Sequence, residues 1–383
     1  LRHTLFPYTT LFRSVGNSAS LSGNTVTSFL RDISGHLWIA TQNNGLNMFD
    51  PHTSKFTHFN YDPQSSCSIG SNKILNLFQD KTGIIWIGTM LGCGANKLNI
   101  FKNKFDHFYH APNKTRSLCE NTIFSLCVDQ YGDLWVGTFQ SGLDRIDRET
   151  DRIIHYQHDP LNPASISDNN IRSIHEDSNG TLWFGTFNSG LNRFNRKTGQ
   201  FTRYFHIPDD TASISSNQVQ CIHEDQFNNF WIGTFGGGLC LMDRVTETFT
   251  IFKNDPANPN SISDNRIYCI VEDTLNSALW IGTFQGGLNR MDIQTKKFTR
   301  YRNDLNDSNS LNNNIVISLF KEPGEDGYLW IGTYGGGLNR FDPKTQSFIH
   351  FDDSDGLPNN VIYGIEADDD LNLWLSTNNG ISK

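Results

Sequence analysis

Histidine, cysteine and carboxylate side chains are the groups with which this chain of 383 residues could perform acid–base, nucleophilic or metal chemistry. Four histidines stand directly before an aromatic residue in equivalent segments: His58, His107, His155 and His350. Arg203 and Arg300 take the same place in other copies of the segment. A place that accepts either histidine or arginine indicates a solvated outer face, so we predict no metal site there.

Cysteines and carboxylates are the remaining candidates for chemistry. The seven cysteines form no Cys-x-x-Cys pair and no zinc-type spacing, which favours small buried residues over metal ligands. Carboxylates recur as Asp-x-x-Gly, for example Asp177 with Gly180, a pattern typical of tight turns. There is no phosphate-binding loop, nucleophile elbow or His-Glu-x-x-His motif. We therefore predict no catalytic residue, no metal site and no cofactor.

Aromatic residues follow the threonine of a recurring phrase, as in "LWFGTF". They are Phe139, Phe187, Phe235, Phe284 and Tyr334. One aromatic ring per copy, at the same loop, would form a partial circle on one face, where sugars or partner proteins could stack. The alternative is that these rings wedge between copies as core.

Arginines follow two to three residues after the next turn, beside Asn192, Asn289 and Asn339. They are Arg193, Arg290 and Arg340. They could donate hydrogen bonds to ligand hydroxyls, or they could tie neighbouring copies together. With the aromatic residues they form the predicted ligand-binding set.

The elements that must position these residues belong to a long internal repeat. All eight tryptophans lie in the phrase, 44 to 50 residues apart. Each period reads as four short strands joined by tight turns, without a helical apolar pattern. In "LWFGT" both faces are apolar, so both faces of the sheet must be covered. Blades stacked around an axis satisfy this requirement, and we predict an all-β propeller of four-stranded antiparallel blades.

Seven complete repeats span residues 15–352, and a partial eighth follows at 353–383. We favour seven blades, with the partial repeat beginning a following blade or propeller. Eight blades, or parts of two consecutive propellers, remain open. Residues 1–14 contain "TLFPYTTLFRS", which back-translates to a common sequencing adapter, so we expect this segment to be non-native.

Net charge excludes one class of partner. The chain carries 31 basic and 40 acidic side chains, for a net charge of −9. Nucleic acids and anionic membranes require clustered Lys and Arg. No apolar run reaches the roughly 18–20 residues of a membrane helix. We expect neither nucleic-acid binding nor membrane contact by this segment.

The unit "NxIxSIxEDxxGxLWIGTxxGGLNRFDxxTxxFxxY" resembles the two-component regulator propeller repeat, over residues 15–383. The resemblance implies the periplasmic sensor part of a histidine kinase or hybrid two-component system. It also implies an extracellular ligand, often an oligosaccharide, and a homodimeric receptor. No kinase segment is present in the chain.

Three functions follow as hypotheses. The first is a non-enzymatic sensing propeller for an oligosaccharide. The second is a lyase-like propeller enzyme, which would need a His and Glu cluster confined to one or two blades together with a metal. The third is a structural spacer or protein-interaction propeller.

Overall fold

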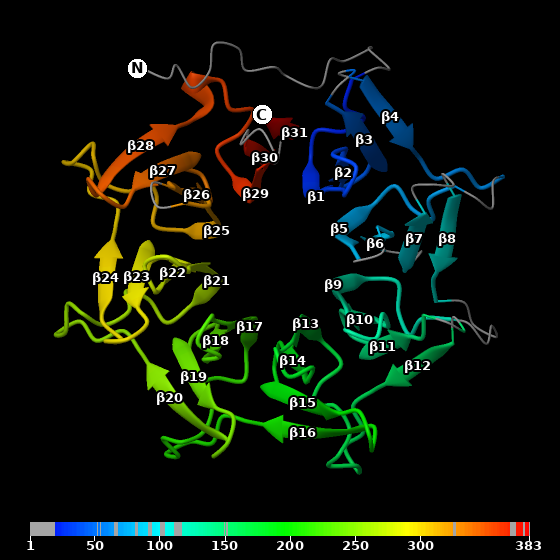
Figure 1. Cartoon of the computed structure of the whole chain (residues 1–383), viewed down its shortest axis with the longest axis horizontal. Coiled ribbons are helices and arrows are strands. Elements are labelled where there is room, and N and C mark those ends of the chain that lie inside the picture. Colours follow the sequence, from blue (N-terminus) through cyan, green and yellow to red (C-terminus); the bar gives the residue numbers. More distant parts are fainter. Residues whose placement is uncertain are drawn as a thin grey trace.

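The computed structural model describes residues 20–51, 53, 55–64, 68–80, 83–90, 94–99, 104–110, 117–148, 150, 152–324, 327–367, 373–377 and 380–382. Seven four-stranded antiparallel sheets stand as blades around a central axis (Figure 1). The predicted all-β propeller with seven complete blades is confirmed. The one helical element of the described residues is a short 3-10 turn, η1 (Asp353–Asp355). The adapter-like residues 1–14 lie outside the described residues.

Each blade runs from the axis outward in sequence order, as Figure 1 shows. The innermost strands are β1 (Val26–Arg31), β5 (Ile74–Gln79), β9 (Ile123–Val128), β13 (Ile171–Glu176), β17 (Val219–Glu224), β21 (Ile267–Asp273) and β25 (Val316–Lys321). The second strands are β2 (Leu37–Thr41), β6 (Ile85–Thr89), β10 (Leu134–Thr138), β14 (Leu182–Thr186), β18 (Phe230–Thr234), β22 (Ala278–Thr283) and β26 (Leu329–Thr333).

The third strands are β3 (Leu46–Asp50), β7 (Ala95–Asn99), β11 (Leu143–Ile146), β15 (Leu191–Asn195), β19 (Leu239–Asp243), β23 (Leu288–Asp292) and β27 (Leu338–Asp342). The outer strands are β4 (Lys55–Phe59), β8 (Lys104–Phe108), β12 (Ile153–Tyr156), β16 (Gln200–Tyr204), β20 (Thr248–Phe252), β24 (Phe298–Tyr301) and β28 (Ser347–Phe351). We call these sheets blades one to seven, in chain order.

The core lies between blades rather than within them. Trp183 of blade four packs in one cluster with Val219, Phe230 and Ile232 of blade five. All eight tryptophans are at most 6% exposed. Because a second strand is buried on both faces, no blade can cover its apolar surface alone, and stacking supplies most of the burial.

Two positions of the repeated phrase require glycine for different physical reasons. A Cβ on Gly185 would lie 2.5 Å from Val219 Cγ1 of the next blade, so this glycine permits close stacking. Gly190 has a φ of +77°, which the second turn requires. The hydroxyl of Thr186 donates to Gly190 O at 2.9 Å and accepts from Ser189 N at 3.1 Å. The "GT" of the phrase thus serves blade packing first and turn closure second.

The partial eighth repeat forms a three-stranded sheet, β29 (Ile362–Ala367), β30 (Leu373–Thr377) and β31 (Gly380–Ser382). We call it the closing sheet, because it lies between blades seven and one (Figure 1). Leu375 packs in a cluster with Trp330 of blade seven. The Trp374 ring lies 5.5 Å from the Phe49 ring of blade one. The closing sheet therefore joins the last complete blade to the first, an arrangement that periodicity left open.

Candidate ligand-binding face

The five predicted aromatic residues lie at one face of the ring, beside the inner strands. The backbone N–H of Phe235 donates to Gln218 O at 2.9 Å, and that of Phe284 donates to Arg266 O at 3.0 Å. Phe139, Phe187 and Tyr334 make the same kind of bond to the residue before their own inner strand. Because inner strands surround the axis, these rings gather around the axis at one face of the propeller.

The rings are neither fully buried nor isolated. Tyr334 is 51% exposed, and the other four are half-buried. Phe235 and Phe284 meet at 5.8 Å between ring centroids, and Tyr268 lies about equally close to both, at 6.1 and 5.8 Å. The Arg266 guanidinium lies 4.7 Å from the Phe284 centroid. The rings are therefore not sealed between blades as core, which was the alternative interpretation.

The same face continues through blades three and four. Phe139 packs edge-on against Phe124 at 5.2 Å. The Arg172 guanidinium lies 4.2 Å from the Phe124 centroid and 4.5 Å from the Phe187 centroid. We call the whole set the aromatic rim; it comprises Phe124, Phe139, Arg172, Phe187, Phe235, Arg266, Tyr268, Phe284 and Tyr334.

Sequence reasoning missed the inner-strand members of the rim. Phe124, Arg172 and Tyr268 each follow the buried first residue of an inner strand. Strand alternation turns such a residue away from the core, so period-two reading of the inner strand could have found them.

The structure separates the three predicted arginines from the rim. Arg193, Arg290 and Arg340 pair in register with Trp183, Trp280 and Trp330. Those tryptophans stand four residues before the rim aromatic, about 13 Å along the strand. Arg193 forms a 2.6 Å ion pair with Glu247 of blade five, and Arg340 covers the Tyr328 ring at 4.3 Å. Arg193 thus ties two blades together, whereas Arg340 stacks on rings of its own blade.

The opposite ends of the strands carry a polar network built on the Asp-x-x-Gly turns. Asp177 Oδ1 accepts from the backbone N–H of Asn179 and of Thr181, at 3.0 and 2.9 Å, as the turn pattern predicts. Its other oxygen accepts the indole N–H of Trp183 at 2.9 Å. Equivalent indole bonds join Trp38, Trp86, Trp135 and Trp231 to their turn aspartates. The turn carboxylate thus also fixes the core tryptophan, which the sequence did not reveal.

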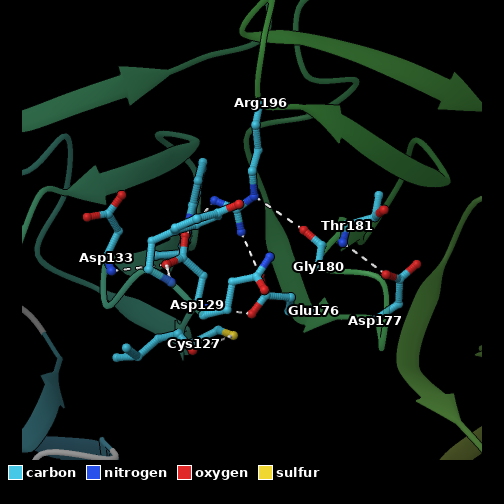
Figure 2. A network of polar contacts seen from close by, with 12 residues as sticks. Cys127, Asp129, Asp133, Glu176, Asp177, Gly180, Thr181 and Arg196 are labelled. Atoms are coloured by element: carbon cyan, nitrogen blue, oxygen red, sulfur yellow. Dashed lines mark hydrogen bonds and ion pairs between the residues drawn. The ribbon is translucent and has the colours of Figure 1, made fainter.

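Arginines of the third turn extend this network between blades. Figure 2 shows Arg196 of blade four reaching Asp129 of blade three, with Nη1 to Oδ2 at 2.6 Å. Its Nη2 meets Glu176 Oε1 at 2.7 Å, and its Nε donates to Gly180 O at 3.3 Å. Arg244 of blade five meets Asp177 of blade four in the same way, at 2.8 Å.

Histidines and glutamates on the inner strands bear on the enzyme hypothesis. His223 Nε2 lies 3.4 Å from Glu272 Oε2, and burial lowers the pKa of His175. The glutamates are engaged structurally: Glu224 binds Arg244 at 2.6 Å, and Glu272 accepts from Gln226 N at 3.1 Å. Histidine takes this inner-strand place only in blades four and five, whereas Val271 takes it in blade six. The pair of histidines therefore breaks the repeat as the enzyme hypothesis asks, but the glutamates beside it are already held by arginine and backbone groups.

Comparisons with known proteins follow the repeat. Six segments match the family model described as the two component regulator propeller: residues 20–43, 68–90, 117–140, 165–188, 213–236 and 261–285. No curated protein matches the chain. The described residues include no helix that could cross a lipid bilayer.

Solved structures resemble the chain at low identity. The extracellular domain of a hybrid two component system from B. thetaiotaomicron is 20% identical, with a TM-score of 0.43, covering 97% of this chain and 64% of that one. The extracellular domain of a one component system from the same organism is 23% identical, with a TM-score of 0.44, covering 94% of this chain and 53% of that one. This chain therefore spans roughly half to two thirds of their lengths.

Virginiamycin B lyase from Staphylococcus aureus is 17% identical, with a TM-score of 0.53, covering 81% of this chain and 92% of that one. This likeness shows the shared propeller fold. The six matched segments fall one in each of blades one to six, and with them the chain belongs to the family of two component regulator propeller repeats.

Proposed function

We propose that this chain is a non-enzymatic sensing propeller of an extracytoplasmic, homodimeric two-component receptor, and that it binds a neutral oligosaccharide at the aromatic rim. The family supports the signalling role, since its repeat is that of two component regulators. The rim carries the proposal of a binding site, because partly exposed aromatic rings at one face of the propeller offer flat faces on which sugar rings stack.

The rest of each blade is committed to packing, which directs a ligand to a loop face. Tryptophans fill the spaces between blades, and the turn carboxylates are bound to backbone, indole and arginine groups. Of the rim's two cations, Arg172 lies against the Phe124 and Phe187 rings, and Arg266 has a carboxylate partner. Arg266 binds Asp264 through two bonds of 3.0 and 2.8 Å, which offsets its charge and favours a neutral sugar over an acidic one.

Titration of the chain with neutral and acidic oligosaccharides, followed by calorimetry and backbone chemical shifts, tests the proposal. We expect weak binding of neutral sugars, with shifts confined to the rim, and loss of binding in Phe235→Ala and Phe284→Ala. Phe227→Ala is the matched control, because Phe227 is 50% exposed in the first turn of blade five, at the opposite end of the strands.

Binding that survives both rim substitutions would overturn the site. Preference for acidic sugars would overturn the charge argument, and no binding across the panel would overturn the ligand class.

A further inference from the structure

A buried side-chain lock recurs at the outer side of the blades. In blade four, Asn192 Oδ1 accepts from Ser167 N at 2.9 Å, and its amide donates to Ser167 Oγ at 2.8 Å. Asn289 and Ser263 repeat the arrangement in blade six, at 2.8 and 2.7 Å. The asparagine belongs to the third strand and the serine to the loop entering the blade, so the lock fastens the entry loop.

Blade one shows the lock with a histidine beside it. Asn47 Oδ1 accepts from Ser22 N at 3.0 Å and lies 2.7 Å from Nδ1 of His58 on the outer strand. A neutral asparagine, a serine and a histidine therefore suffice for the structural task.

Blade three replaces two members of this set. Asp144 stands for the asparagine and Cys119 for the serine, while His155 keeps the histidine's place. Asp144 is 0% exposed; its Oδ2 accepts from Cys119 N at 2.9 Å, and its Oδ1 lies 2.5 Å from His155 Nδ1. The ligand atoms of Cys119, Asp144 and His155 all lie within 4.8 Å of one another.

The exchange brings no advantage to the lock itself. A carboxylate cannot donate the hydrogen bond that the asparagine amide gives to the entry loop, and a buried charge costs far more than a buried amide. The only cation beside Asp144 in the described residues is His155, and only when its imidazole is protonated. A thiol, a carboxylate and an imidazole converging on one point are, however, ligands that zinc prefers.

We propose that Cys119, Asp144 and His155 bind a divalent cation of the zinc type, through Sγ, a carboxylate oxygen and Nδ1. Three protein ligands leave a fourth position for water, and the His155 side chain, 44% exposed, lies on the solvent side. On binding, the Cys119 thiol releases its proton to solvent as the thiolate–metal bond forms. A protonated His155 likewise releases its Nδ1 proton.

The geometry requires adjustments of about 1 Å, because the ligand atoms lie within 4.8 Å of one another and not yet at the spacing of metal ligands. Metal–ligand bonds of about 2.0–2.3 Å place ligand atoms about 3.2–3.8 Å apart, so the contact between Asp144 and His155 must open by about 1 Å. Rotation of the partly exposed imidazole supplies this movement, whereas Asp144 and Cys119 are held by strand and loop. The cation would join the entry loop, β11 and β12 of blade three.

Sequence reasoning set the histidines aside because arginine replaces them elsewhere, and it found no zinc-type spacing. The three ligands are separated by 25 and 11 residues, and only the fold brings them together. Comparison of the repeats position by position carries the signal, since aspartate and cysteine occur together in this lock in blade three alone among the described blades.

Cobalt(II) titration of the full chain tests the site, because a cobalt–thiolate bond absorbs in the near ultraviolet. We expect one equivalent to give this band and zinc to displace it, with affinity falling as the pH is lowered, because protons compete with the metal for its ligands. Cys119→Ser combined with Asp144→Asn recreates the set of blade one, so the variant should fold, and it should lower zinc affinity by at least about a hundredfold.

Cys240→Ser is the matched control. Cys240 takes the third-strand place in blade five, where its Sγ lies 3.0 Å from Ser215 Oγ without a histidine or aspartate beside it. The cobalt band should persist in this variant. Absence of the band in the wild-type chain, or its persistence in the double variant, would overturn the proposal. Asp144→Asn alone, with unchanged zinc affinity, would remove the carboxylate from the ligand set.

Discussion

At the scale of single residues, the repeated phrase is read best as a set of steric and hydrogen-bonding requirements. Trp183 fills the space between two blades and donates its indole N–H to Asp177. Gly185 leaves room for Val219 of the next blade, and Gly190 supplies a left-handed turn. Each residue of the phrase thus meets a different steric or hydrogen-bonding requirement. Every blade has the same requirements, which explains why the phrase recurs along the chain.

Two glycines of blade four separate backbone strain from steric collision. Both have a left-handed φ, +77° at Gly190 and +70° at Gly199. A Cβ on Gly190 would collide with Tyr204 O, whereas one on Gly199 would meet nothing within 4 Å. We expect Gly199→Ala to lower the free energy of unfolding by about 1 kcal/mol and Gly190→Ala by about 3 kcal/mol. Urea unfolding of both variants gives the comparison, and equal losses would contradict the collision.

His175 makes stability depend on pH. Burial is the first cause that lowers its pKa, and no hydrogen-bond partner for its Nε2 lies among the described residues. The folded state therefore resists the proton that the unfolded state accepts below about pH 6.5, so stability falls as pH drops below that value.

Phe78 takes the same place in blade two, so we expect His175→Phe to fold and to lose less stability than wild type between pH 7 and 5. Urea midpoints across this range measure the difference. An imidazole that titrates at or above pH 6.5 in the folded protein, by NMR, would contradict the argument.

At the scale of elements, strands and turns follow from local pattern, and contacts between blades do not. Alternation and glycine placement predicted four strands per repeat and the turn role of Asp177, and the structure confirms both. The ion pair of Arg196 with Asp129 joins residues 67 apart. The repeat aligns these positions but does not say which blades exchange side chains, so the ties, and the separation of Arg193 from the rim, needed the fold.

Arg196 is expected to contribute to the stability of the interface between blades three and four. Its removal would leave Asp129, whose side chain is 0% exposed, without its charge partner. We expect Arg196→Ala to lower the free energy of unfolding by about 3 kcal/mol, because an unpaired buried charge is costly. Arg148→Ala is the control, since Arg148 is exposed at the same place of blade three. Similar losses in the two variants, measured by urea unfolding, would contradict the tie.

At the scale of the whole molecule, the ring is a cycle of similar interfaces with one irregular member. The repeat in the sequence does not predict how the ring closes, because each copy of the repeat predicts only its contact with the next copy. In this structure the three strands of the closing sheet fill the place between blades seven and one. Trp374 packs against Phe49 of blade one, as the other tryptophans pack against the blade that follows their own. Closure thus depends on the smallest sheet of the ring.

Trp374→Ala tests whether closure has its own local stability. The substitution removes a side chain that is 1% exposed and packed with Leu37, Ile39 and Phe49, a loss on the order of 3–5 kcal/mol at that interface. Because each interface contacts only its neighbours, we expect amide exchange in β1–β4 and β29–β31 to accelerate by about tenfold or more, while β13–β16 across the ring keep their protection. Trp183→Ala is the control, as it should move the acceleration to blades four and five. If amide exchange accelerated uniformly around the ring in both variants, the propeller would open only as a whole. The closing interface would then have no local stability of its own.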